Sequence, residues 1–175
     1  LDAIASRFLI ALAGLTRLLD AQAVSDTDPA AVAGYALLDV DDTIIEVHGH
    51  AKQGAGFGYS GVRGLNALLA TLTTVGSAPV VVAQRLRKGS TGSPRGAKRL
   101  VGDAVRTARR LLKAVGKTQP ILVRMDSAFY GRGPVHAALA GGAHVSVTVR
   151  MDKAVKKAIT AIDAAAWTTI EYTDA

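Results

Sequence analysis

The sequence predicts an α/β fold in which a mixed sheet, an antiparallel meander extended by parallel strands, is flanked by helices. Short runs of β-branched and aliphatic residues, bounded by glycine and polar clusters, mark the strands. The early runs follow one another closely, as in a meander, whereas the later ones alternate with helical segments, as in parallel strands joined by crossovers. The 175 residues suffice for one domain with a core or for a piece of a larger one.

The first third of the chain is expected to contain helix and then strand. Residues 2–23 are rich in Ala and Leu with apolar spacing near 3.6, which favours a helix. Residues 25–31 form a turn and capping cluster that can start another helical piece. A compact β run covers residues 35–40, and residues 43–49 continue it as a strand or bulged strand.

The middle of the chain is expected to complete the meander. Residues 52–64 are glycine-rich, which argues against regular structure and permits close backbone approach. The apolar segments 65–74 and 78–87 favour an antiparallel hairpin, although the Ala and Leu content of the first also allows a helix there. Residues 97–115 form an amphipathic helix with one apolar stripe and a basic opposite face.

The remaining elements alternate between strand and helix. In order, they are a strand at 119–125, a helix at 134–142, a strand at 143–151, a helix at 152–162 with Asp152 as its N-cap, and a strand at 167–172. This order is that of the ribonuclease H-like fold, in which a three-stranded meander is followed by a helix and by strands added in parallel. In that fold the first strand is central and lies beside the fourth.

Acidic residues stand at the ends of the strands that this fold makes neighbours. In LLDVDDT, alternation puts Asp39 and Asp41 on one face of the strand and Asp42 on the other. We favour Asp41 as a metal ligand with Thr43 as a supporting hydroxyl; Asp39 is the alternative ligand, and Asp42 is read as a solvated or capping residue.

The second acid, Asp126, directly follows the strand in ILVRMDSAF. Two carboxylates that meet in a partly dry site cannot both ionise freely, and a divalent cation is the usual remedy. Asp126 is therefore read as the second metal ligand, although an acid in this position is also a common helix N-cap. His48 and His50 have spacing suited to a metal, but no third ligand is evident beside them.

The positive charge is concentrated in one part of the chain. The net charge is +7, and residues 85–117 hold eleven basic side chains against one acid, Asp103. Such a block indicates a polyanionic partner, with DNA the obvious one, or else a solvated helix face. The candidates for DNA contact are Lys52, Arg63, Arg87, Lys88, Arg95, Lys98, Arg99 and Arg124, the last being alternatively a charge partner of an acid.

Composition restricts the setting of the protein. The chain has no cysteine, which excludes disulfides and thiolate metal sites and fits a reducing compartment. The apolar run at residues 8–15 is too short to span a bilayer. A soluble, intracellular protein without membrane partners is expected.

The motifs in their order resemble the bacterial DDE-type transposases of insertion sequences. The similarity rests on Asp-x-Thr at 41–43 before VHG, Leu-Arg-x-Gly at 86–89, Arg-x-Asp-Ser-x-Phe at 124–129 and the final AAWTTIEYTDA. It covers about residues 37–175. Each motif alone is weak, but the ordered set is specific.

The resemblance implies a ribonuclease H-like catalytic core in which Asp, Asp and Glu hold two divalent cations, Mg²⁺ or Mn²⁺. Asp41 matches the first acid and Asp126 the second. The implied reaction is cleavage of DNA at terminal inverted repeats and joining of the ends to target DNA. The implied setting is cytoplasmic and nucleoid-associated, with a homodimer in the synaptic complex.

The third acid has no match in this sequence. In the family the Glu follows a long insertion, and Glu46 and Glu171 lie in the wrong places to replace it. We therefore expect a truncated chain, with an N-terminal helical segment at 1–33, a partial ribonuclease H-like core at 34–151 and the start of the insertion region at 152–175. Such a chain is expected to bind DNA but to cut it poorly.

Two other interpretations remain open on the sequence. One is a haloacid dehalogenase-type phosphatase, because LLDVDDT reproduces that signature with Asp39 as nucleophile and Asp41 as acid/base. Against it, Asp126 has no partner acid in the following five residues. The other is an inactive, DNA-binding transposase remnant.

Overall fold

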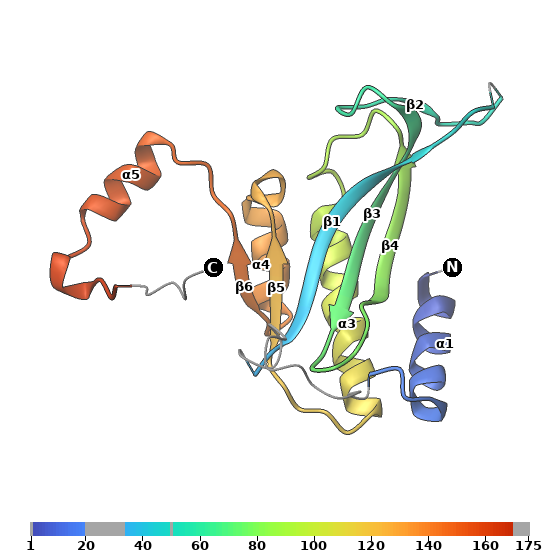
Figure 1. Cartoon of the computed structure of the whole chain (residues 1–175), viewed down its shortest axis with the longest axis horizontal. Helices are drawn as coiled ribbons and strands as arrows, with labels where there is room; N and C mark the ends of the chain where they lie inside the picture. Colours follow the sequence, from blue (N-terminus) through green and yellow to red (C-terminus); the bar gives the residue numbers. More distant parts are fainter. Residues whose placement is uncertain (1, 20–33, 50, 170–175) are drawn as a thin grey trace.

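The computed structural model describes residues 2–19, 34–49 and 51–169 (Figure 1). The helices are α1 (Asp2–Leu15), α3 (Ala97–Ala114), α4 (Arg132–Ala140) and α5 (Lys153–Thr160), with 3₁₀ turns η1 (Ser127–Phe129) and η2 (Ala164–Ala166). The strands are β1 (Ala36–Glu46), β2 (Gly56–Phe57), β3 (Arg63–Thr73), β4 (Val80–Lys88), β5 (Ile121–Met125) and β6 (His144–Val147). None of the helices in these ranges combines the length and apolarity that crossing a bilayer requires.

The strands form one mixed sheet with β1 at its centre. β3 pairs antiparallel with β1 and, on its other side, with β2 and β4. β5 pairs parallel with β1, and β6 pairs parallel with β5. The predicted meander and parallel extension are thus confirmed, with the first strand beside the strand at 121–125.

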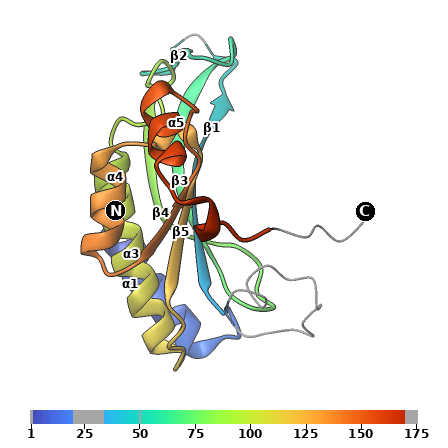
Figure 2. The ribbon, with the colours of Figure 1, turned by 90° about the vertical axis from the view of Figure 1, so that its left-hand side faces the viewer.

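One face of the sheet is covered by helices. Figure 2 shows α1, α3 and α4 together on one side of the strands. The predicted apolar stripe of α3 is buried there against β1 and β3, with Leu100, Val101, Ala104, Val105, Ala108, Leu111 and Leu112 in the core. Leu38 and Val40 of β1 point into this core, so by the pleat Asp39 and Asp41 lie on the opposite face, which we call the open face.

The segment at 65–74 is a strand, and the helical alternative is wrong. Its Ala and Leu content favours a helix locally, but β1 and β4 pair with it on both sides. Pairing and burial of Leu68, Ala70 and Leu72 outweigh a propensity difference of a few tenths of a kcal/mol per residue.

Other boundaries differ from the expected ones. The runs at 35–40 and 43–49 form one continuous strand, and α1 ends at Leu15. β6 stops at Val147 because its neighbour β5 ends at Met125, whose carbonyl receives the N–H of Thr148 at 3.1 Å. The expected strand at 167–172 is not formed at 167–169; its remainder and the cluster at 25–31 lie outside the described residues.

The helix predicted at the end of the chain is confirmed. α5 begins after Asp152, whose Oδ1 accepts the N–H groups of Ala154 and Val155 at 2.9 Å each. This is the expected N-cap arrangement. The helix buries no side chain and stands away from the sheet (Figure 1).

Candidate active site

The register between β1 and β5 brings the two acidic motifs to one end of the sheet. The paired positions run from Ala36 with Ile121 to Val40 with Met125, each pair 85 residues apart. Asp41 and Asp126 have the same separation and stand one step beyond the last pair. Because directly paired residues of parallel strands point to the same face, this register favours neighbouring carboxylates on the open face.

A bidentate ion pair precedes the two acids in the same register. Arg124 donates from Nε to Oδ1 of Asp39 at 2.6 Å and from Nη2 to Oδ2 at 2.8 Å. The hydrogen bond that Arg124 donates to Asp39 raises the pKa of Arg124, outweighing the opposing effect of burial. Arg124 therefore acts as a charge partner, and both oxygens of Asp39 are already engaged.

Asp41 and Asp126 each keep one carboxylate oxygen in a local backbone contact. Oδ1 of Asp41 accepts the N–H of Asp42 at 2.8 Å. Oδ1 of Asp126 accepts the N–H of Ala128 at 2.9 Å, so Asp126 is the N-cap of η1. Both side chains are exposed, which leaves them accessible to a cation or a substrate. Thr43 is exposed on the same face as Asp41, two residues further along β1.

Asp42 is neither solvated nor a capping residue, and that interpretation is wrong. It lies on the helix-covered side, where its Oδ2 is 3.1 Å from Nη2 of Arg87 and also accepts from the amide of Asn66. The side chains of Asp42 and Arg87 are 13% and 9% exposed. A position of β1 that faces the helices thus holds an ion pair, which the positions of Arg87 on β4 and Asn66 on β3 explain.

The donor set near Asp41 and Asp126 fits a hard divalent cation in part. Mg²⁺ in proteins is commonly bound through one or two carboxylates together with waters and substrate phosphates, and two exposed carboxylates match this pattern. Within the part of the chain that the structure describes, no three or more His, Cys, Asp or Glu side chains group into a metal site. His48 lies 3.9 Å from Glu46, and His50 is outside the described residues.

The candidates for DNA contact fall into two groups. The first group comprises five exposed side chains: Lys52, Lys88, Arg95, Lys98 and Arg99. The other three are engaged in contacts within the fold, although Arg124 is exposed as well. Arg63 donates to the carbonyls of Val47 and Gly49 at 3.2 and 2.8 Å, and Arg124 holds Asp39.

Arg87 fits a structural role better than a phosphate contact. Its guanidinium binds Asp42, the Asn66 amide oxygen and the carbonyls of Ser93 and Arg95, at 3.0 and 2.6 Å for the last two. Burial lowers the pKa of Arg87, and the nearby Asp42 opposes that shift. The motif Leu-Arg-x-Gly thereby ties the loop after β4 to β1 and β3.

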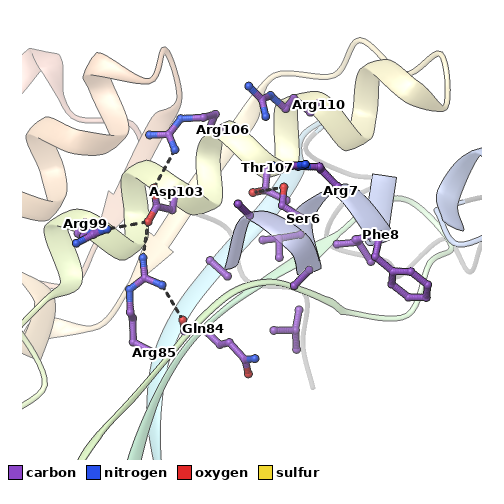
Figure 3. A pocket seen from close by; sticks show the side chains of 16 residues that line it. Ser6, Arg7, Phe8, Gln84, Arg85, Arg99, Asp103, Arg106, Thr107 and Arg110 are labelled. Carbon is purple, nitrogen blue, oxygen red and sulfur yellow. Dashed lines mark hydrogen bonds and ion pairs between the residues drawn. The ribbon is translucent and has the colours of Figure 1, made fainter. Parts of the chain in front are cut away.

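A second cluster of charged residues was not anticipated. Arg7, Arg85, Arg99, Arg106 and Arg110 line a groove of about 710 Å³ between α1, β4 and α3 (Figure 3). The spacing of Arg99, Asp103, Arg106 and Arg110 places them on one helix face and could have indicated part of it. The contributions of α1 and β4 depend on packing, which the sequence pattern does not contain.

Comparison with known proteins places these features in a family. The family model of the transposase DDE domain matches residues 33–173. The chain belongs to this family. Asp41 and Asp126, which the sequence predicts as the first two acids of the motif, lie within the matched range.

The DDE domain is also similar to a solved transposase. The structure is that of a piggyBac transposase synaptic complex with hairpin DNA, at 14% identity and a TM-score of 0.42. The match covers 74% of this chain and 26% of the other, so the chain spans about a quarter of that transposase's length. No curated protein gives a significant match.

Proposed function

We propose that this DDE domain is the catalytic portion of a DNA transposase of the bacterial insertion-sequence type, with Asp41 and Asp126 as its first two acids. The observation that supports the pair is the constant 85-residue offset of β1 and β5, which continues to Asp41 and Asp126. The reaction is phosphodiester hydrolysis at terminal inverted repeats and transfer of the ends to target DNA. Its setting is the bacterial cytoplasm, at the nucleoid.

The roles of the side chains follow from their surroundings. Asp41 and Asp126 would hold Mg²⁺ or Mn²⁺ with the oxygens that backbone N–H groups leave available. When bound, two such cations activate the attacking oxygen and neutralise charge on the leaving oxygen. Arg124 neutralises Asp39, which limits repulsion between Asp39 and the neighbouring Asp41. Thr43 is the supporting hydroxyl on that face.

This arrangement argues against Asp39 as a phosphatase nucleophile. A nucleophilic carboxylate needs an oxygen that can approach phosphorus, yet both oxygens of Asp39 are held by Arg124. The haloacid dehalogenase-type reading therefore requires this ion pair to break. The transposase reading leaves the pair intact.

The DNA-cutting activity that we expect depends on whether a third acid joins Asp41 and Asp126. Among the described residues no further acid joins Asp41 and Asp126. We therefore propose that the chain by itself binds DNA, with Lys52, Lys88, Arg95, Lys98 and Arg99 contacting phosphates, and cuts it poorly. In the transposase, two copies would act on paired DNA ends.

The metal role of Asp126 can be separated from its capping role. Asp126→Asn keeps a side-chain oxygen that can cap η1, whereas Asp126→Ala removes the cap at a cost of about 1 kcal/mol. We expect Mn²⁺ at tenfold excess over its dissociation constant to stabilise the wild-type chain by about 1.4 kcal/mol. Asp126→Asn should keep the metal-free melting temperature and lose this gain; Asp126→Ala should lose both.

The matched control is Asp152→Asn, which alters the N-cap of α5 in the same way at a distance from the site. It should retain the full Mn²⁺ effect in thermal unfolding. If Asp126→Asn also retains it, the acids do not form a cation site, and the chain is better described as a DNA-binding remnant. Strong Mn²⁺-dependent nicking of plasmid DNA that Asp126→Asn abolishes would contradict the expected weak activity but support the site.

A further inference from the structure

The groove between α1, β4 and α3 is strongly cationic. Among the described residues that line it, five are arginines and one is an acid, Asp103. They come from three elements: Arg7 from α1, Arg85 from β4 and the rest from α3. Like charges that share a concave surface repel one another, so this arrangement costs stability unless an anion binds there.

Asp103 holds three of the arginines in place. It accepts from Nη2 of Arg85 and from Nη1 of Arg106 at 2.9 Å, and it lies 3.9 Å from Nε of Arg99. Figure 3 shows the carboxylate between these three guanidinium groups. Arg99 and Arg106 are 83% and 62% exposed, so most of their N–H donors remain available to a ligand. The acid thus orders the cations without neutralising the group.

The walls of the groove are fixed by the fold. Ser6 of α1 and Thr107 of α3 share a hydrogen bond of 3.1 Å between their hydroxyl oxygens. Ala13 is buried in the core, and Leu9 packs against that core. Packing and a polar contact therefore set the position of α1 against α3. Because Arg7 belongs to α1, this position places Arg7 at the groove.

The length over which the arginines of the groove extend along α3 indicates the class of ligand. Arg99 and Arg110 are eleven residues apart on α3, which corresponds to about 16 Å. A single phosphate or carboxylate meets one or two guanidinium groups, whereas phosphates along one DNA strand recur about every 3.4 Å of axis. Guanidinium groups bind phosphate oxygens bidentately. A repeating phosphodiester matches the row better than a small anion.

The groove also lies away from the acidic pair. It opens beside the helices, at the edge strand β4, whereas Asp41 is on the open face, with β1 between it and the core, and Asp126 follows β5 in the same register. We infer that the groove is a second DNA-backbone site, which binds a duplex segment other than the one at Asp41 and Asp126. This inference relies on the proposed function for the identity of the polyanion.

The test is the salt dependence of DNA binding. A fluorescent random-sequence duplex serves as the probe, and its affinity is measured by anisotropy over a range of salt concentrations. The double variant Arg106→Ala/Arg110→Ala removes two positive charges from the groove. Alanine is a good helix former, so α3 should be kept. We expect the slope of log affinity against log salt to fall by about 1.8, because each phosphate contact contributes about 0.9. The affinity at about 0.1 M salt should fall at least about tenfold.

The matched control is Lys153→Ala/Lys156→Ala, which makes the same charge change on the exposed helix α5. It should keep most of the wild-type slope. An equal loss in both variants would mean general charge attraction and would overturn the inference, as would an unchanged slope in the groove variant. If the groove variant does not fold, the exposed Arg7→Ala replaces it, with an expected loss of about 0.9 in slope.

Two further outcomes separate the possible failures. Asp126→Asn should keep the wild-type salt slope while losing the Mn²⁺ effect, so the groove and the proposed cation site fail independently. The other candidate occupant is an acidic protein surface, such as that of a second copy. Self-association in light scattering that the groove variant abolishes, with an unchanged DNA slope, would assign the groove to that partner and overturn the inference.

Discussion

Asp41 and Asp42 are sequence neighbours with opposite surroundings. Asp41 is exposed on the open face, whereas Asp42 points toward the helix-covered face and pairs with Arg87. The pleat of β1 alone explains the division. It does not explain why a carboxylate is tolerated on the inner side, because burying an unpaired charge is costly. Arg87 and Asn66 supply that explanation.

The buried ion pair yields a prediction at this scale. Arg87→Met removes the charged partner of Asp42, which keeps only the Asn66 amide, and should lower the free energy of unfolding by about 3–5 kcal/mol. Asp42→Leu/Arg87→Met removes both charges and should recover most of this loss. Urea denaturation measures the three values.

Lys88→Met is the control, because Lys88 adjoins Arg87 in β4 but is exposed. It should change the unfolding free energy by less than about 0.5 kcal/mol. If Arg87→Met behaves like Lys88→Met, the contacts of Arg87 do not hold the loop after β4, and a role in phosphate binding becomes the better interpretation.

The sequence identified the acids of the candidate site but not their partners. The sequence draws attention to Asp39, Asp41 and Asp126. A carboxylate at the end of an apolar strand costs free energy, and the stability of a fold rarely requires one there. The sequence left two roles open for Arg124, a charge partner of an acid or a contact to DNA. The geometry selects the first, because Arg124 forms an ion pair with Asp39. The pairing of residues that are 85 positions apart depends on strand register, and the hydrophobic periodicity of the sequence does not encode that register.

At the scale of elements, the glycine-rich segment has a packing reason. β2 pairs with the start of β3, and the loop after β4 crosses this pair closely. A Cβ on Gly89 would lie 2.0 Å from the carbonyl oxygen of Gly64 and 2.3 Å from that of Gly56. The sequence indicated close backbone approach in this region, and the structure shows which backbones meet.

Gly89→Ala should therefore destabilise the protein. The atoms in its way are backbone carbonyls of the sheet, so the loop must shift and lose its contact. We expect a loss of at least about 2 kcal/mol in the free energy of unfolding, within the range of overpacked sites.

Gly92→Ala is the matched control, because nothing lies within 4 Å of its Cβ position. It should be neutral or stabilising by up to about 1 kcal/mol. Equal unfolding free energies for both variants, measured by urea denaturation, would show that the crossing of the loop over β2 and β3 adjusts freely.

The elements themselves were predicted well where periodicity is strong. The amphipathic pattern located α3 to within one residue, and the Asp152 cap located the start of α5. The prediction was less precise for β6, whose length is decided by its neighbour β5, and for β3, whose composition also suits a helix. Both cases depend on tertiary pairing.

At the scale of the whole molecule, one part of the chain packs around a common core and another part does not. The sheet and α1, α3 and α4 share one core, whereas α5 buries no side chain and stands apart (Figure 1). Segments with few buried contacts open at low free-energy cost. The expectation that residues from 152 onward belong to a separate region can be tested on this basis.

Limited trypsin digestion should cut first between β6 and the end of α5. Arg150, Lys153 and Lys156 are exposed there, whereas sites such as Arg85 lie in a strand paired within the sheet. Mass spectrometry of early fragments should show a stable product ending near Arg150. Early cleavage within β4 or α3 instead would mean that the sheet and its helices do not form the stable unit.

The sequence by itself determined the kinds of element, the apolar faces and the acids that mark the candidate site. These are local properties, since a repeat of 2 or 3.6 residues fixes which side chains share a face. The tertiary structure alone decided the pairing of Asp39 with Arg124, the burial of Asp42 with Arg87 and the meeting of three elements at the arginine groove. Those contacts join residues distant in the chain, and they form only because burial of a common core brings their elements together.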